Sequence, residues 1–412
     1  MNRAEKIEIL APAGDFESLA SALKAGADSV YFGVGKLNMR SRAAANFAVS
    51  DLPKIVKFCR KFGANPYLAL NSVIYDEELE EAKKICNAAA KAGVAAIIAT
   101  DVAVMELARS AGLPVHISVQ ANVSNYEAVK FFAKFADTII LARELTLAQI
   151  GNIIGKIREE KLRGPSGELV RIEIFAHGAL CVSISGKCYM SIAKYNSSAN
   201  RGDCYQTCRR KYRVIDEETG YEMTVDNQYV MSPSDLCTIR IIDKILDTGV
   251  KVLKIEGRGR PPEYVGTVTT AYKNAVELWR RGKFSANKAE KLEKELEKVF
   301  NRGFWHGGYY LGDTAGVWSG ISGSAATLKK TALGIIVNYY NKIKIAELEL
   351  QAGDLKKGDK LLVTGTKTGC LIFDVGELQV EGEKRDVAHK GETVTFVSEN
   401  KIRRNDKVYT IS

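Results

Sequence analysis

The chain has 412 residues, of which 46% are hydrophobic and 26% charged, and its formal net charge is +10. This length exceeds one ordinary core, so we expect two domains or one large domain with an appendage. No run of 18 apolar residues occurs, which excludes a membrane-spanning helix, and Met1–Lys6 lead into a strand without an apolar signal region. We therefore expect a cytoplasmic protein. Its basic charge suits a polyanionic partner such as RNA, or serves solubility alone.

Up to Arg260 the sequence repeats one unit, in which a helical pattern ends at a glycine and a short apolar strand follows. The helix-ending glycines are Gly26, Gly63, Gly93, Gly112 and Gly249. Asp15 is placed to cap the first helix. The expected strands are Ile7–Ala11, Ser29–Gly33, Pro66–Leu70, Ala95–Ala99, Pro114–Val119, Asp137–Leu141, Val170–Phe175 and Lys251–Ile255. Such alternation predicts a (β/α)8 TIM-like barrel, with a doubly wound open sheet as the alternative.

In barrels of this kind the chemistry lies at the carboxyl ends of the strands. The polar residues expected there are Asn71, Gln120, Asn122, Arg143, Glu144, His177, Glu256, Arg258 and those of the segment 35–42. For any one of them, capping of the next helix is the alternative role.

A long insertion follows the seventh strand, from 176 to 237, before a helix expected at Ser234–Thr248. Insertions of this length on the catalytic face are usually functional. This one holds five of the eight cysteines, namely Cys181, Cys188, Cys204, Cys208 and Cys237. In a reducing compartment clustered cysteines indicate metal binding or catalysis more often than disulfides.

The cysteine spacing bears on the kind of metal. Structural zinc favours two short C-x2-4-C pairs, but only Cys204 and Cys208 form one here. The wide, uneven spacing favours an iron–sulfur cluster over zinc, and buried unliganded thiols are the third alternative. Gly186 and Gly202 would let the backbone approach a cluster closely.

Other catalytic patterns are weakly represented. The chain has four histidines and contains no H-E-x-x-H, G-x-S-x-G or Walker A sequence. A Cys–His hydrolase built from Cys181 and His177 would leave the other clustered thiols unexplained. The run R-R-K-Y-R at 209–213 suits an RNA backbone with a stacked base, or the charged face of an edge strand.

The rest of the chain changes character after the last barrel strand. We expect helices at Pro261–Gly282 and Ser285–Phe300, which complete a barrel domain over 1–300, and a Gly/Ser-rich linker over 301–330. The segment 331–412 alternates apolar and polar residues between turns, which predicts a small antiparallel β-barrel domain. Lysines in this region would form either an RNA-binding surface or an ordinary solvated surface. They are Lys329, Lys330, Lys356, Lys357 and Lys360.

The sequence resembles peptidase family U32, the collagenase-like proteases, from Leu10–Gly14 to the C-terminus. The shared signature is Glu173, Phe175, Gly178, Ala179, Cys181, Gly186, Cys188 and Ser191, followed by N-R-G-D-C at 200–204, C-R-R-K-Y at 208–212, S-P-x-D-L-C at 232–237 and K-I-E-G-R at 254–258. One departure is K-Y-N-S at 194–197, which lies between candidate ligands.

The resemblance implies more than proteolysis, because the chain is similar to the branch that forms 5-hydroxyuridine at the wobble position of tRNA, with prephenate as cosubstrate. That branch carries a [4Fe–4S] cluster. By position, the implied ligands are Cys181, Cys188, Cys204 and Cys237, with Cys208 in exchange for Cys204 as the main alternative and zinc as the alternative metal. Implied partners are tRNA, a small carboxylate cosubstrate and a related U32 protein, but no membrane.

Three hypotheses follow, the first being an iron–sulfur-dependent tRNA hydroxylation enzyme. Its expected groups for phosphate or carboxylate are Arg40, Arg42, Lys254 and Arg258, with Arg209 and Arg210 facing RNA. The groups expected to read a base edge or move protons are Gln120, Asn122, His177 and Glu256. The second hypothesis is a U32 peptidase that hydrolyses peptide bonds, and the third is a non-catalytic scaffold that carries the cluster.

Overall fold

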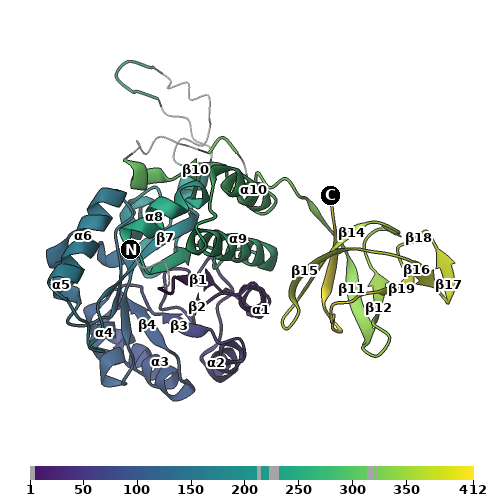
Figure 1. The fold of residues 1–412 in the computed structure, drawn as a ribbon, viewed down its shortest axis with the longest axis horizontal. Coiled ribbons are helices and arrows are strands. Elements are labelled where there is room, and N and C mark those ends of the chain that lie inside the picture. The colour runs from purple at the N-terminus through teal and green to yellow at the C-terminus, as the bar shows by residue number, and fades with distance from the viewer. Residues whose placement is uncertain (1–4, 211–214, 222–231, 313–318, 322) are drawn as a thin grey trace.

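A computed structural model describes residues 5–210, 215–221, 232–312, 319–321 and 323–412. Its larger part is the predicted closed barrel (Figure 1). Neighbouring strands pair in parallel in chain order, and β9 closes the ring by pairing with both β1 and β7. The eight barrel strands are β1 (Glu8–Pro12), β2 (Ser29–Phe32), β3 (Asn65–Ala69), β4 (Ala96–Ala99), β5 (Val115–Ile117), β6 (Thr138–Ile140), β7 (Arg171–Gly178) and β9 (Val252–Ile255). All eight predicted strands are therefore confirmed, and the open-sheet alternative is wrong.

Helices surround the barrel and bury apolar stripes against it. They are α1 (Phe16–Lys24), α2 (Leu52–Lys61), α3 (Leu79–Ala92), α4 (Val102–Ser110), α5 (Tyr126–Phe132), α6 (Leu147–Glu159), α8 (Ile242–Thr248), α9 (Pro262–Arg280) and α10 (Ala286–Glu297). Asp15 caps α1 as predicted, accepting a hydrogen bond from the Ser18 amide at 2.7 Å. The five predicted helix-ending glycines all have positive φ, the backbone region in which a missing Cβ removes the strain.

Two short strands that the sequence did not predict extend the barrel sheet. Strand β8 (Asp235–Cys237) pairs antiparallel with the end of β7, and β10 (Phe304–His306) pairs in parallel with β8. The expected helix at Ser234–Thr248 therefore begins only at Ile242, and the expected linker 301–330 starts with a strand of the barrel domain. Both strands form because partners that are distant in the sequence pair with them, and a local pattern of residues does not reveal such pairing.

Within the long insertion the described residues form α7 (Met190–Tyr195) and short 3-10 turns. Gly202 lies against the loop after β2, where a Cβ would come within 2.0 Å of the Asn38 carbonyl oxygen. This close packing holds the insertion on the barrel. It also explains why a residue without a side chain occupies position 202, whether or not a cluster is bound nearby.

The C-terminal region is antiparallel, as predicted, with its own apolar core. Eight strands pair in the order β15-β14-β20-β11-β12-β19-β16-β17, so β15 and β17 are edges. Their bounds are β11 (Lys330–Tyr340), β12 (Ile345–Leu350), β14 (Lys360–Gly365), β15 (Gly369–Asp374), β16 (Leu378–Val380), β17 (Glu383–Arg385), β19 (Thr393–Val397) and β20 (Lys407–Ile411), while β13 (Leu355–Lys356) pairs with β18 (Val387–Ala388).

The two regions meet where the turn before β15 approaches α1 and α9 (Figure 1). Lys24 on α1 donates a hydrogen bond to the Thr368 carbonyl oxygen at 2.7 Å, and Lys330 pairs with Glu263 on α9 at 2.6 Å. In the part of the chain that the structure describes, no helix is both long and apolar enough to span a bilayer.

Candidate active site

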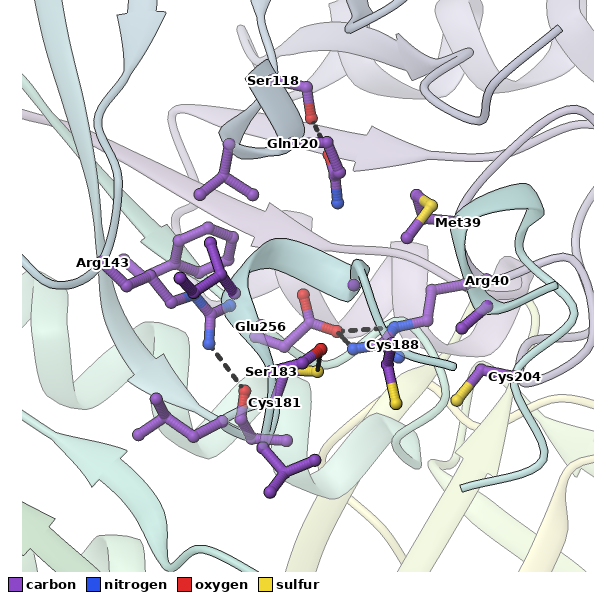
Figure 2. A pocket seen from close by; sticks show the side chains of 18 of the residues that line it. Met39, Arg40, Ser118, Gln120, Arg143, Cys181, Ser183, Cys188, Cys204 and Glu256 are labelled. Carbon is purple, nitrogen blue, oxygen red and sulfur yellow. Dashed lines mark hydrogen bonds and ion pairs between the residues drawn. The ribbon is translucent and has the colours of Figure 1, made fainter. Parts of the chain in front are cut away.

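A cavity of about 190 Å³ opens at the carboxyl end of the barrel, under the cysteine-rich insertion (Figure 2). Strands β2, β3, β4, β6, β7 and β9 each contribute a lining side chain, and the 3-10 turn Val119–Ala121 after β5 contributes two. The insertion forms the opposite wall with residues from 179 to 208. The cavity thus lies where barrel chemistry is expected.

Glu256 and Arg40 form an ion pair in this cavity. Arg40 donates to the Glu256 Oε1 atom from Nε at 3.0 Å and from Nη2 at 2.7 Å, and the Tyr31 hydroxyl reaches Oε2 at 3.3 Å. Burial alone would raise the pKa of Glu256, but the charges of Arg40, Arg143 and Arg258 outweigh it and lower the pKa to about 2. Glu256 is therefore ionised at neutral pH, and it orients Arg40 more readily than it accepts a proton.

Arg258 and Lys254 are buried basic groups that line the same cavity. Lys254 donates to the Glu173 Oε1 atom at 2.9 Å, so the Glu173 carboxylate neutralises the charge of Lys254. Arg258 instead donates to the neutral Asn38 side chain at 2.9 Å, and burial lowers its pKa to about 10. A desolvated guanidinium without a direct carboxylate partner in the described chain favours an incoming anion.

Arg143 adds a third guanidinium to the cavity. Its Cζ atom lies 3.8 Å from the centre of the Phe175 ring, and its Nη1 atom donates to the Ala179 carbonyl oxygen at 3.0 Å (Figure 2). Stacking and hydrogen bonding hold the group in one position, with a cation available to a ligand.

Neutral polar groups form the opposite side of the cavity. Asn71 donates to the Gln120 Oε1 atom at 3.1 Å and to the Ser118 hydroxyl at 3.2 Å, and Ser118 also contacts Gln120. Amides and hydroxyls of this kind suit the edge of a nucleobase. Asn122 does not line the cavity; its φ of 56° places it at the end of the 3-10 turn, with its buried Oδ1 atom unpartnered in the described chain.

Four cysteines line the cavity, namely Cys181, Cys188, Cys204 and Cys208. Burial raises the pKa of Cys208 to about 11, and the neighbouring thiols Cys181, Cys204 and Cys188 add to this effect. The pKa of Cys181 is lowered: burial acts to raise it, but hydrogen bonds from Ser183 and the charge of Arg143 outweigh that effect. Among the described residues, no three histidine, cysteine or acidic side chains are already arranged as a metal site.

Cys237, which is predicted as one of the four ligands, does not line this cavity. It is fully buried in β8, next to Tyr272, and burial raises its pKa to about 12. Its pairing opposite His177 in β7 holds it behind the barrel wall, outside the cavity. The structure therefore groups Cys208, and not Cys237, with Cys181, Cys188 and Cys204.

His177 is also absent from the cavity wall. Its ring lies among Tyr264, Tyr272 and Phe304, and its Nδ1 atom is 3.4 Å from the Tyr272 hydroxyl. Burial lowers its pKa to about 3, so the ring is neutral at physiological pH. The geometry gives no support to a catalytic His177 or to a Cys181–His177 hydrolase pair.

The remaining predicted basic residues lie outside this cavity. Arg209 donates to the Ser232 hydroxyl at 2.8 Å and to the Pro233 carbonyl oxygen at 2.6 Å, which makes it a brace within the insertion. Arg210 is exposed and contacts the Tyr195 hydroxyl. Arg42 pairs with Asp203 at 3.0 Å in a neighbouring cavity. The rest of the basic run, 211–213, lies outside the described residues.

Comparison with known proteins places the chain in a family. The family model described as "Peptidase family U32" matches residues 14–319. A protein named "Collagenase" from Porphyromonas gingivalis is 48% identical over 402 residues, covering 98% of this chain and 97% of that protein. The chain belongs to peptidase family U32.

Other relatives of this U32 protein have names that refer to RNA. The "tRNA hydroxylation protein P1" of Bacillus subtilis is 30% identical over 97% of this chain and 93% of its own length. The "23S rRNA 5-hydroxycytidine C2501 synthase" of Escherichia coli is 33% identical over 73% of this chain, which spans 45% of that protein. The family thus includes hydroxylation proteins as well as proteins named as proteases.

Proposed function

We propose that this U32 protein is an iron–sulfur-dependent tRNA hydroxylation enzyme that forms 5-hydroxyuridine at the wobble position, with prephenate as cosubstrate. The observation that carries the proposal is the gathering of Cys181, Cys188, Cys204 and Cys208 at one cavity beside basic and amide groups. Soft thiolates from separate turns suit an iron–sulfur cluster better than the paired spacing of a zinc ribbon. A relative named for tRNA hydroxylation aligns over 97% of the chain.

The donor set fits such a cluster by its chemistry. The four thiols named above would hold it, and when bound it supplies electron transfer and Lewis-acid chemistry at the cavity. The pKa of Cys181 is already lowered, which favours its deprotonation for ligation. Cys208, whose pKa is raised to about 11, would ligate only with loss of a proton to solvent.

The residues of the chain itself would position two substrates. Arg258 and Arg143 are available to the carboxylate groups of a cosubstrate such as prephenate, because neither is paired with a carboxylate in the described chain. The cluster of Asn71, Ser118 and Gln120 would hydrogen-bond the edge of a uracil base. Lys254 lies at the bottom of the cavity with its charge offset by Glu173. Glu256 would hold the Arg40 guanidinium in place at the cavity through two hydrogen bonds.

The decisive experiment is metal and sulfide analysis of anaerobically purified protein, with nucleoside mass spectrometry of tRNA from cells that lack the gene. We expect iron and sulfide in the protein and loss of 5-hydroxyuridine from the tRNA. Cys208→Ala should lose iron. Cys237→Ala should retain it, with Cys86→Ala as the control for a buried thiol outside the cavity. Protein without iron, or unchanged tRNA, would refute the proposal.

Peptide hydrolysis is the second candidate, favoured by the name of the 48% identical relative. Against it, no histidine lines the cavity that holds Cys181. Hydrolysis of gelatin that persists in His177→Gln protein but is lost in Cys181→Ser protein would favour a thiol mechanism without a histidine base. Absence of hydrolysis by the zinc-loaded and the anaerobic protein would exclude this candidate.

A further inference from the structure

A second cavity, of about 640 Å³, lies beside the candidate active site. It is lined by the loop after β2, the loop after β3 and the part of the insertion from 192 to 203. Most of its side chains are polar or charged, and Tyr75 is its aromatic residue. The surface is therefore unlike an apolar groove for a helix and more like a site for a polar, partly aromatic ligand.

The same segments of the chain separate the two cavities. Consecutive residues of the same segments line one cavity and then the other: Met39 and Arg40 face the active site, and Ser41 and Arg42 face the second cavity. The same alternation occurs at Asn71 and Ser72, at Ala199 and Ser198, and at Cys204 and Asp203. A ligand that extends beyond the active site on this side would enter the second cavity directly.

Tyr75 forms a rigid aromatic platform in the second cavity. The Arg201 guanidinium lies 3.7 Å from the centre of its ring. Two hydrogen bonds to Glu78, at 2.6 and 3.0 Å, fix that guanidinium in place, and the Glu78 carboxylate also accepts from the Tyr75 amide at 2.9 Å. Tyr75 is nonetheless 49% exposed. An aromatic residue that is held from one side and about half exposed is suited to stacking.

Basic groups stand near this platform. Arg42 pairs with Asp203 at 3.0 Å and stacks at 3.5 Å on the Tyr205 ring, which keeps its guanidinium at the cavity edge. Lys36 is exposed, and no carboxylate among the described residues pairs with it. The combination of a stacking ring, a free ammonium and several hydroxyls matches a base, a phosphate and a ribose.

We propose that the second cavity binds the nucleotide adjacent to the target base of a single-stranded RNA. The base of this adjacent nucleotide would stack on Tyr75, and its phosphate would contact Lys36 and Arg42. The proposal relies on the proposed function only for RNA being the substrate. Flanking nucleotides commonly set the sequence context of enzymes that act on an unstacked base. The second cavity would accordingly hold the strand while the target base enters the barrel.

The test uses the full-length protein and a fluorescein-labelled oligouridylate, with binding measured by fluorescence anisotropy. Tyr75→Ala should weaken binding about tenfold, and Tyr75→Phe should bind like the unmodified protein because stacking is retained. Phe131→Ala is the matched control, since Phe131 is 52% exposed on α5, away from both cavities. Unchanged binding by Tyr75→Ala, or equal weakening by Tyr75→Phe, would overturn the stacking role.

Lys36→Ala provides an independent measurement that does not depend on the platform. Loss of one phosphate contact should reduce the slope of log K against log salt by about 0.7. An unchanged slope, or no binding of the oligouridylate by the unmodified protein, would overturn the proposal. Binding that depends on Tyr75 in a protein that leaves tRNA unmodified would support this site and refute the proposed hydroxylation. Hydroxylation of tRNA that is unaffected by Tyr75→Ala would support the proposed hydroxylation and overturn the proposed nucleotide site.

Discussion

Glu173 and Lys254 form a buried ion pair below the active-site cavity, with side chains 0% and 5% exposed. The second carboxylate oxygen of Glu173 has no hydrogen-bond partner in the described chain, and burial raises the pKa of this carboxyl group. Such a pair adds little net stability, but each member needs the other, because a lone buried charge is strongly unfavourable.

We predict that Glu173→Gln lowers the free energy of unfolding by about 3–5 kcal/mol, because it leaves the Lys254 ammonium buried without a counter-charge. Urea denaturation measures this change. The double variant Glu173→Gln/Lys254→Met should lose clearly less than the sum of the two single variants. Additive losses would show that the pair is not coupled.

Glu256 gives the cavity a dependence on pH. Its folded-state pKa is depressed to about 2, below the ordinary value of 4.5, so its stabilising effect is present above pH 4.5 and is lost as the pH falls towards 2. This shift corresponds to about 3 kcal/mol. Glu256→Gln should therefore be less stable than the unmodified protein at pH 7, with the difference shrinking between pH 4.5 and 2. A difference that does not change with pH would contradict the assigned pKa.

The pKa of His177 is also lowered, like that of Glu256, but for a different reason. Burial lowers its pKa from 6.5 to about 3, so folding excludes a proton that the unfolded chain binds below pH 6.5. We predict that His177→Gln loses less stability than the unmodified protein on acidification from pH 6.5 to 4. Thermal unfolding across this range measures the effect.

At the scale of elements, the start of β15 and the turn before it connect the two regions. Gly369 has a φ of +71°, and a Cβ there would lie 2.9 Å from the backbone nitrogen of Ser21 on α1. Both the backbone conformation and the close approach to the helix require glycine at this position.

Gly369→Ala should therefore lower the unfolding temperature by more than Gly382→Ala. Gly382 has a φ of +85°, but open space surrounds its missing Cβ, so this control carries the backbone strain without the steric contact. Differential scanning calorimetry compares the two variants. Equal losses would show that α1 yields to the added methyl group.

The whole molecule has two separate apolar cores, and they are joined where β15 lies against α1 and α9. Besides the packing at Gly369 and the next residues of β15, that contact includes a hydrogen bond from Lys24 and ion pairs such as Lys330–Glu263. Exposed pairs of this kind contribute about 0–1 kcal/mol each and are screened by salt. We predict two calorimetric transitions that move further apart at high salt. A single transition at all salt concentrations would show that the regions unfold as one unit.

Local pattern in the sequence determined the eight barrel strands, the helix-ending glycines and the Asp15 cap, because each depends on neighbours a few residues away. It also placed polar residues correctly at the strand ends, where Asn71, Gln120, Arg143 and Glu256 now line one cavity. A long cysteine-bearing insertion on that face was equally visible.

Tertiary structure alone decided which of these residues meet. Cysteine spacing does not tell which thiols share the cavity, but pairing of β8 with β7 buries Cys237 behind the barrel wall. The same pairing removes His177 from the cavity. The second cavity likewise arises from loops after β2 and β3 packed against the insertion. Spacing along the chain limits how far apart two side chains can lie. Whether a side chain faces the cavity or the barrel wall depends on long-range strand pairing and packing.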